Sequence, residues 1–342
     1  MRAVKIWLWV GVFMVFIQVL IGGITRLTGS GLSITEWSVI MGAVPPTNAA
    51  QWNDAFEQYK QFPQYQLVNQ HFTLSEFKNI FWWEYLHRNW ARLIGLVFLF
   101  PFIWFWIRKT IDRTWKNKLW IVFLLGGLQG LMGWIMVASG LIDMPWVSPY
   151  NLTMHLLLAL LVFCYLQWLA LSITNKKVNV DYFLINKNIK IILALVIAQI
   201  IFGGFMAGTK AGMIMNTYPL MEGKFIPDGL NNHTGLVRNI FENTIAINFI
   251  HRTLAAIVFI SIITFVIRFR KQENILLRRL TYALGIFICI QFLLGVCTLL
   301  EGSGGIPITL GVLHQSVAFI CTFFIVAILF YSRKRNTTPL IN

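Results

Sequence analysis

Eight apolar runs in the chain are each long enough to cross a lipid bilayer. The hydrocarbon core of a bilayer is about 30 Å thick, so a helix needs roughly 20 apolar residues to span it. Of the 342 residues, 57% are hydrophobic and 12% are charged. The runs occupy approximately residues 6–25, 83–107, 119–139, 152–173, 190–209, 246–267, 281–300 and 309–331. Because an open sheet cannot satisfy its backbone hydrogen bonds in lipid, the sequence predicts an all-α polytopic membrane protein with eight transmembrane helices.

Basic residues gather in the loops that would share one side of the membrane. Arg2 and Lys5 precede the first run, and further clusters lie within residues 108–118, 268–279 and 333–335. Since cytoplasmic loops carry an excess of Lys and Arg, both termini are predicted to be cytoplasmic. The few residues ahead of the first run leave no room for an organelle transit peptide, so a bacterial inner (plasma) membrane is expected. The formal charge of +15 is split among short loops, which argues against nucleic-acid binding.

The sequence also repeats itself, because each half contains two Gln-x-x-x-Gly motifs and two histidines in corresponding spans. Gln18 and Gly22 correspond to Gln199 and Gly203, Gln129 and Gly133 to Gln291 and Gly295, His87 to His251, and His155 to His314. An even number of spans per repeat predicts two four-helix bundles, residues 1–175 and 176–342, related by a pseudo-twofold axis along the membrane normal. The Gln-x-x-x-Gly motifs are interpreted as helix-packing elements, because glycine permits close approach and glutamine can bond to a neighbouring helix.

The four histidines are the strongest functional signal. His87, His155, His251 and His314 each lie near the end of a span that faces the outer side. Two helices of a bundle can place one imidazole on each face of a porphyrin. A structural role or a proton relay is the alternative for a single intramembrane histidine, but four in repeat-related places favour two haems, ligated within the two halves by His87 with His155 and by His251 with His314.

Charged residues beside the first histidine of each half extend this prediction. Arg88 and Arg252 directly follow a histidine, and guanidinium groups suit the propionate carboxylates of haem. Glu84 lies three residues before His87, whereas Asn248 holds the corresponding place in the second half. An ion pair between Glu84 and Arg88, four residues apart, is the structural alternative. The difference suggests a reactive first half and a second half whose haem is a permanent cofactor.

Several long segments carry a specific family resemblance. GGITRLTGSGLSITEWSVIMGAVPP (Gly22 to Pro46) and FWWEYLHRNWARLIGLVF (Phe81 to Phe98), with NFIHRTLA and GVLHQSVA later, resemble the haem A synthase family in its longer, mitochondrial-like branch. The resemblance covers residues 6 to about 331. Some relatives carry a cysteine pair in the outer loop after the first span, but the segment from Ser33 to Met41 contains no cysteine, so a thiol relay is not expected here.

The resemblance implies an enzyme, an oxidoreductase that acts on a CH group. Members of this family oxidise the C8 methyl of haem O to a formyl group through successive hydroxylations, giving haem A for terminal oxidases. By resemblance, His251 and His314 would ligate the iron of a haem b cofactor. His87 and His155 would lie around the haem O substrate, whose iron both or one of them would hold, and Glu84 would be the catalytic carboxylate. Whether the formyl oxygen comes from water or dioxygen is left open, as is the electron acceptor.

Partners and rival functions follow from the same observations. The expected partners are haem O, haem O synthase, the assembly machinery of the terminal oxidase and the lipid bilayer, with no nucleic acid; a homo-oligomer is left open. A di-haem b electron-transfer protein would explain the histidines but not a glutamate beside one haem only. A duplicated transporter would explain the repeat, but the spans lack the broken midplane helices of such proteins.

The longest segment outside the membrane covers residues 26–81. Thr73 and Glu76 form a capping-box pattern at the start of a helix that would continue into the second span. Residues 52–65 could form a short helix at the membrane interface. The segment is predicted either to cover the first haem site as a lid or to be a plain connector.

Overall fold

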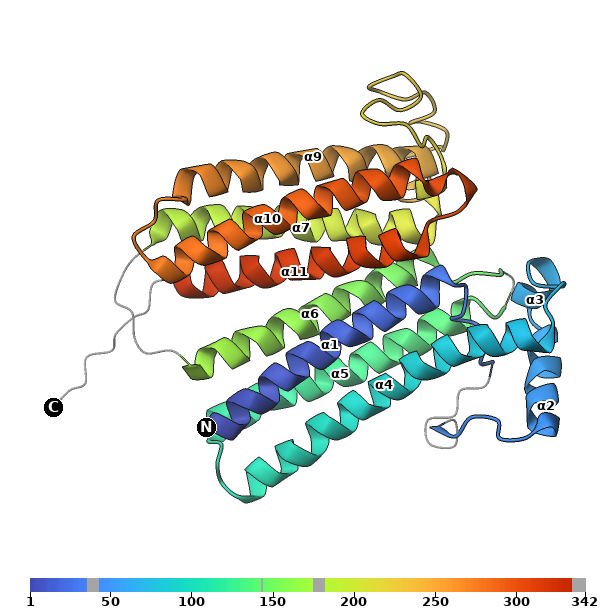
Figure 1. Ribbon diagram of the computed structural model, residues 1–342, viewed down its shortest axis with the longest axis horizontal. Coiled ribbons are helices and arrows are strands. Elements are labelled where there is room, and N and C mark those ends of the chain that lie inside the picture. The colour runs from blue at the N-terminus through green and yellow to red at the C-terminus, as the bar shows by residue number, and fades with distance from the viewer. Residues whose placement is uncertain (36–42, 143, 175–181, 334–342) are drawn as a thin grey trace.

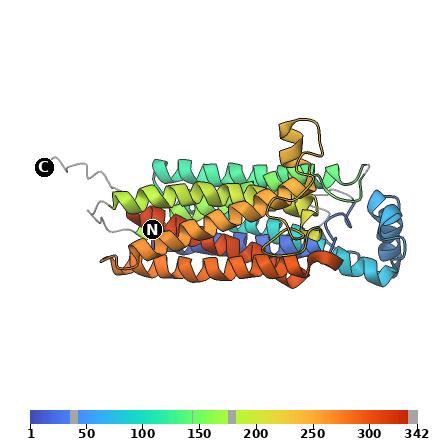
Figure 2. The same cartoon turned by 90° about the horizontal axis from the view of Figure 1, so that it is seen from above.

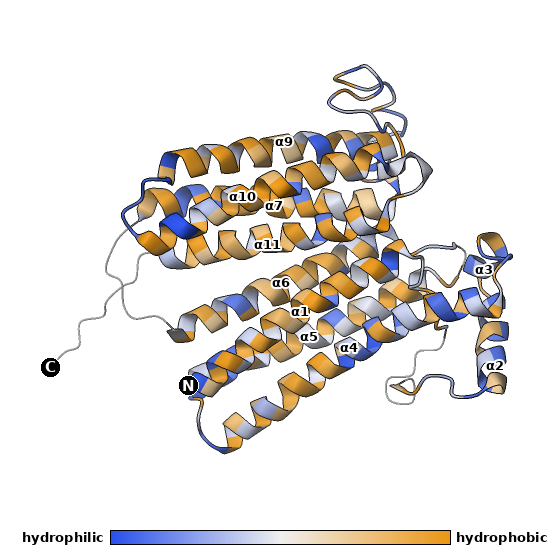
Figure 3. Ribbon diagram, in the orientation of Figure 1, coloured by the Kyte–Doolittle hydropathy of each residue, from blue (hydrophilic) through white to orange (hydrophobic). Residues whose placement is uncertain are grey.

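The computed structural model describes residues 1–35, 43–142, 144–174 and 182–333, and within these ranges eight helices are long and apolar enough to cross a membrane. They are α1 (Arg2–Leu27), α4 (Leu74–Ile107), α5 (Arg113–Ser139), α6 (Pro149–Thr174), α7 (Phe183–Gly208), α9 (Thr244–Phe269), α10 (Ile275–Leu300) and α11 (Ile308–Ser332). Every predicted span is therefore confirmed. Figure 3 shows the apolar residues running along these helices, with polar residues concentrated towards their ends and in the loops.

The remaining described elements are short and lie in the loops. They are α2 (Ala49–Lys60), α3 (Pro63–Leu67), α8 (Leu236–Phe241) and the 3-10 turns η2 (Ala211–Met213) and η3 (Gly302–Gly304). Within the described ranges, β-type pairing is limited to one isolated bridge between Met221 and Lys224. The all-α prediction is confirmed.

The long helices form two adjacent groups of four. In the first, α1 packs on α4 and α6, and α5 packs on α6; in the second, α7 packs on α9 and α11, and α10 packs on α11. Figure 1 shows the groups side by side, with the start of α1 and the end of α11 at the same end. The matching pattern of contacts is compatible with the predicted pseudo-twofold relation. The predicted division between residues 175 and 176 falls within 175–181, outside the described residues.

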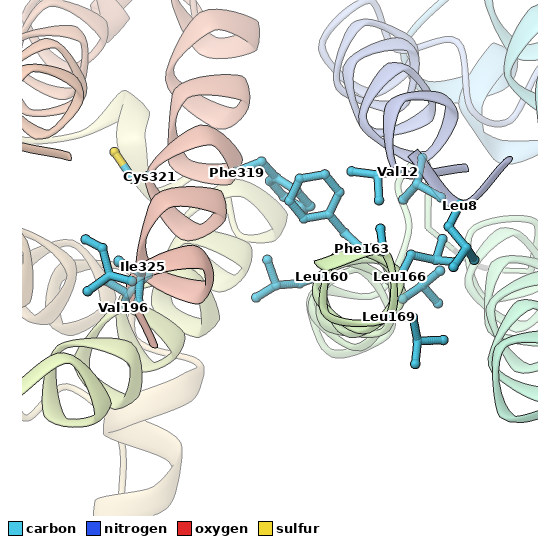
Figure 4. Packing of buried hydrophobic residues seen from close by; sticks show 14 of the residues in the cluster. Leu8, Val12, Leu160, Phe163, Leu166, Leu169, Val196, Phe319, Cys321 and Ile325 are labelled. Atoms are coloured by element: carbon cyan, nitrogen blue, oxygen red, sulfur yellow. The ribbon is translucent and has the colours of Figure 1, made fainter. Parts of the chain in front are cut away.

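The two groups meet along an apolar seam. Phe163 of α6 packs edge-on against Phe319 of α11, with ring centroids 5.5 Å apart, and Figure 4 shows this pair between the two groups. Two glutamines bond across the seam. Gln167 Nε2 donates to the carbonyl of Phe323 at 2.7 Å, and Gln315 Nε2 donates to the carbonyl of Val19 at 2.8 Å. These two hydrogen bonds thus fix how the helices of one half are aligned along the helices of the other.

Helix α4 is longer than its predicted span because a polar capping box extends it. Thr73 and Glu76 make both reciprocal bonds of the box, as predicted. With 34 residues and a rise of about 1.5 Å each, α4 is about 51 Å long and exceeds a bilayer core. Figures 1 and 2 show α2 and α3 beside its projecting end. The short helix predicted within residues 52–65 is present as two helices, α2 and α3.

The projecting end of α4 and the two short helices share a small aromatic core, which we call the outer lobe. Its buried members are Trp52, Phe56, Tyr59, Phe77, Ile80 and Phe81. The Tyr59 hydroxyl is fully enclosed; it donates to Gln64 at 3.0 Å and accepts from Asn69 at 2.8 Å. This packing gives the segment a defined structure of its own. The lid function stays a prediction.

Candidate functional site

In the first half, each histidine packs on the preceding membrane-spanning helix. His87 of α4 faces α1, where Gln18 Nε2 donates to the His87 carbonyl at 3.1 Å. His155 of α6 faces α5, where Gln129 Nε2 lies 3.2 Å from the ring Nε2 and 3.1 Å from the carbonyl oxygen of His155. The glutamine of each Gln-x-x-x-Gly motif is therefore a direct neighbour of a predicted haem ligand.

The second half repeats this arrangement. Gln199 of α7 places its Nε2 3.2 Å from Nδ1 of His251 on α9. Gln291 of α10 places its Nε2 3.2 Å from Nδ1 of His314 on α11. All four glutamine–histidine pairs thus join a histidine helix to the membrane-spanning helix before it.

The glycines of the same motifs leave room for the imidazole rings. A Cβ atom built on Gly22 would lie 2.9 Å from Nε2 of His87, and one on Gly133 would lie 3.0 Å from Cε1 of His155. The corresponding distances to the Cε1 atoms of His251 and His314 are 3.4 Å at Gly203 and 2.9 Å at Gly295. A larger residue at Gly22, Gly133 or Gly295 would push against the ring, whereas a Cβ atom on Gly203 would be in ordinary contact with it. The motifs do pack helices, as predicted, but what they pack against is the histidine itself.

One of the two predicted histidine pairs shares a cavity, whereas the pairing of His87 with His155 stays a prediction. His251 and His314 both line one cavity of about 270 Å³ in the second half. Its wall is mostly apolar and aromatic, including Phe259 of α9, as is usual for a site that encloses a flat organic cofactor.

Glu84 is held in a dense set of hydrogen bonds. Its Oε2 accepts from the backbone amide of Ser33 at 2.7 Å, from the Ser33 hydroxyl at 2.7 Å and from the amide of Ile34 at 2.8 Å. Its Oε1 pairs with Arg88, with Nη2 at 2.6 Å and Nε at 3.1 Å. The side chain is 2% exposed. The ion pair offered as the structural alternative is therefore present, and it fixes the direction in which this carboxylate points.

The second half has the same framework without the carboxylate. Asn248, buried at the place of Glu84, donates through Nδ2 to the carbonyls of Ala211 at 2.8 Å and Ile214 at 3.0 Å. Arg252 donates to the carbonyl of Met215 at 3.3 Å, as Arg88 does to the carbonyl of Ile34 at 2.8 Å. The two halves thus have matching loops but differ in charge, because the first has Glu84 where the second has Asn248.

The residues present fit haem groups held between paired imidazoles. Each half carries two of the predicted histidines, and a glycine of the neighbouring helix lies against each imidazole ring. The glutamine Oε1 atoms beside the rings are buried and, within the described residues, accept no hydrogen bond: Gln18, Gln129, Gln199 and Gln291. At Gln199 and Gln291, turning the amide over would place Oε1 where it can accept a hydrogen bond from Nδ1–H of His251 and His314, an arrangement that commonly orients metal-bound imidazoles. In the described parts of the chain, no group of three or more His, Cys, Asp or Glu side chains is placed so that it could hold a metal ion.

Two features of the site escaped the sequence analysis. The contact of each glutamine with a histidine was missed because the motif does not say which helix it faces. The presence of Arg26 in the wall of the second-half cavity was also missed. The repeat aligns Ala207 with Arg26, but it does not show that a residue of the first half lines a cavity of the second.

Comparison with known proteins agrees with this geometry. Residues 5–326 match the family model described as "Cytochrome oxidase assembly protein". The chain is 41% identical over 326 residues to a protein of Flavobacterium johnsoniae named "Heme A synthase", covering 93% of this chain and 94% of that protein. Proteins of the same name from Flavobacterium psychrophilum and Nitrosospira multiformis are 43% and 42% identical, each over 93% of this chain and over 95% and 90% of their own lengths.

Proposed function

This chain belongs to the cytochrome oxidase assembly protein family, in which its relatives are named haem A synthase, and from that premise we propose that it is a haem A synthase. The reaction proposed is oxidation of the C8 methyl of haem O to a formyl group by successive hydroxylations, which makes the protein an oxidoreductase acting on a CH group. The observation that carries the proposal is the duplicated histidine pair with a buried carboxylate in one half only.

The second half is proposed to hold a haem b cofactor, ligated by His251 and His314. The cavity lined by both rings supports this assignment, and Asn248 gives this half no carboxylate at the position of Glu84. A haem bound between two histidines supplies one-electron chemistry. Arg252, which also lines the cavity, is proposed to interact with a propionate.

The first half is proposed to bind haem O, with His87 and His155 holding its iron and Arg88 near a propionate. Glu84 lies one turn before His87 on α4, and its burial and fixed orientation support a role at the reacting methyl. A carboxylate held in one orientation can stabilise positive charge that develops nearby, and it can accept a proton from an attacking water once it releases one of its donors. General-base help of this kind is worth about 10²- to 10⁴-fold in rate.

Position in the membrane and partners complete the proposal. Both termini are proposed to be cytoplasmic in a bacterial inner membrane, which puts all four histidines towards the outer face. The expected contacts are haem O synthase as the source of substrate and the terminal oxidase assembly machinery as the recipient of the product.

The test is to co-express the protein with a haem O supply, extract its pigments, and separate them by reversed-phase chromatography with mass detection. Wild-type protein should yield formyl haem, whereas Glu84→Ala should yield haem O or a hydroxylated intermediate. Glu57→Ala is the matched control, because Glu57 is an exposed carboxylate of the outer lobe that pairs only with Lys60 among the described residues. If wild-type samples returned only unmodified haem b, the enzyme assignment would fail in favour of a di-haem b electron-transfer protein.

A second comparison separates chemistry from structure at Glu84, because this residue also fixes the loop at Ser33. Ser33→Ala removes one donor and keeps the carboxylate, so it should reduce product formation far less than Glu84→Ala. Equal losses in the two variants would assign Glu84 a structural role. The haem b content of both variants reports whether the second half has folded.

A further inference from the structure

Arg26 joins the two halves at the outer ends of their helices. It is the penultimate residue of α1, and its guanidinium donates to the carbonyl of Ala207 in the last turn of α7. The two residues are 181 positions apart, the same offset that relates Gln18 to Gln199. Arg26 and Ala207 are therefore equivalent positions of the repeat that meet, and only one of them carries a charge.

The side chain of Arg26 lies in the wall of the second-half cavity, although α1 belongs to the first half. A guanidinium carries five N–H donors, and within the described residues Ala207 is the one acceptor that it has. No carboxylate in these parts of the chain forms an ion pair with it. A cation in an apolar, membrane-embedded wall is costly unless an anion compensates it.

Arg252, the other arginine in this wall, is used differently. Its guanidinium donates to four backbone carbonyls of the loop that follows α7, at distances from 2.8 to 3.3 Å: Met215, Thr217, Pro219 and Leu220. Most of its donor capacity is therefore spent on that loop. The remaining capacity can serve the propionate contact proposed for Arg252, but Arg26 keeps more donors for a ligand than Arg252 does.

We propose that Arg26 binds a carboxylate of the ligand in the second-half cavity, so that the first half supplies one anchoring residue to the site of the second. The ligand chemistry required is a propionate of the haem that His251 and His314 would ligate, and the inference rests on that proposed function. Planar guanidinium forks suit carboxylates because they can donate two parallel hydrogen bonds. The first-half site receives no such cation from α7, since Ala207 stands at the equivalent place.

This asymmetry matches the two proposed roles. A haem that stays bound through many turnovers benefits from an extra anchor, whereas a substrate that must leave as product does not. The cation would also raise the reduction potential of the second-half haem, because reduction adds a negative charge that a nearby cation stabilises.

The test uses purified full-length protein and two pigments, haem b and its dimethyl ester, in which both propionates are blocked. Wild-type protein should retain haem b more tightly than the ester. Arg26→Gln should lose about ten- to a hundredfold in affinity for haem b, the usual worth of a hydrogen bond to a charged group, and should lose little for the ester. Arg26→Lys should restore part of the preference, and the midpoint potential of the remaining haem should be lower in Arg26→Gln than in wild type.

Lys210→Gln is the matched control. It also removes one positive charge at the outer end of α7, but Lys210 lies against Trp146, 4.3 Å from its ring centroid, and does not line the cavity. It should leave the preference for haem b unchanged.

Each outcome decides a different point. An unchanged preference and potential in Arg26→Gln, with normal haem content, would overturn the inference and leave Arg26 as a cap on the carbonyl end of α7. Wild-type protein that takes up haem b without histidine ligation, or takes up none, would overturn the proposed cofactor site and this inference with it.

Discussion

Glu84 and Asn248 occupy equivalent places in the two halves, but Glu84 accepts hydrogen bonds from its loop whereas Asn248 donates hydrogen bonds to its loop. Glu84 accepts hydrogen bonds from the amides of Ser33 and Ile34, whereas Asn248 donates to the carbonyls of Ala211 and Ile214. The two loops therefore present different backbone groups at the same position. A carboxylate fits the first loop and an amide fits the second, so the charge difference between the halves is built into the backbone as well as the side chain.

Exchanging the second of these residues should be destabilising. In Asn248→Asp, a carboxylate would face two carbonyl oxygens without a donor, and we expect a loss of about 1–3 kcal/mol in the free energy of unfolding. The measurement is the thermal unfolding of purified protein, followed by loss of the haem absorption. A variant as stable as wild type would mean that the loop can turn its amides inward, as the loop at Ser33 does.

The glycine beside His314 should tolerate no larger residue. Gly295→Ala would place a methyl 2.9 Å from Cε1 of the ring, and overpacking of this kind costs about 1–3 kcal/mol. We expect reduced haem b content and an altered spectrum of the reduced protein. Gly130→Ala is the control, because no atom lies within 4 Å of that Cβ position. The interpretation fails if both variants keep the wild-type spectrum.

The glutamine beside His251 should affect the haem more than the fold. Gln199→Leu removes the amide that contacts the ring, so the midpoint potential of the second-half haem should shift while the protein remains folded. Gln167→Leu is the matched control, since Gln167 is also a glutamine within a membrane-spanning helix but bonds to the carbonyl of Phe323 on the seam. Redox titration of both variants gives the answer, and equal shifts would count against a specific role for Gln199.

The outer lobe should loosen at strongly alkaline pH. Burial raises the pKa of Tyr59 from 10.0 to about 12, because the enclosed hydroxyl resists ionisation. The folded lobe thus holds this proton more tightly than the unfolded chain, so its stability is unaffected below pH 10 and falls as the pH rises from about 10 to 12. Protease cleavage within α2 and α3 should increase over that range.

Tyr59→Phe tests the assignment of this pH dependence. The variant should be weaker at neutral pH, because it removes the donor to Gln64 and the acceptor for Asn69, but its cleavage should depend less on alkaline pH. An unchanged alkaline response would trace the loosening to another group.

The membrane-spanning helices were predictable because length and apolarity decide them, but not all of their starts were. The span predicted from residue 119 begins at Arg113, since Asp112 caps the helix and the basic residues that follow belong to its first turns. The start of α4 was predictable, because the capping box of Thr73 and Glu76 is visible in the sequence. Hydropathy marks the part of a helix in lipid, whereas capping hydrogen bonds mark where the helix begins.

Some features of the candidate site were likewise predictable from the sequence and others were not. The repeat identified the four histidines and the difference between Glu84 and Asn248, because these are properties of single positions. It could not show that each Gln-x-x-x-Gly motif cradles a histidine, because that depends on the rotation of one helix against another. The position of Arg26 in the cavity wall could not be predicted either. It depends on how the two halves meet, which a repeat within the chain does not specify.

The glycines beside the histidines have a consequence for how the bundle can vary. In each of the four pairs an imidazole ring fills the space that a side chain of the neighbouring helix would otherwise take, so the thickness of one aromatic ring sets the separation of the two backbones. The spacing of the helices therefore determines where the four histidines, the proposed iron ligands, are located. A change that spreads or tightens one pair by the width of a methyl group moves a ligand by the same amount, even when it occurs far from the histidine.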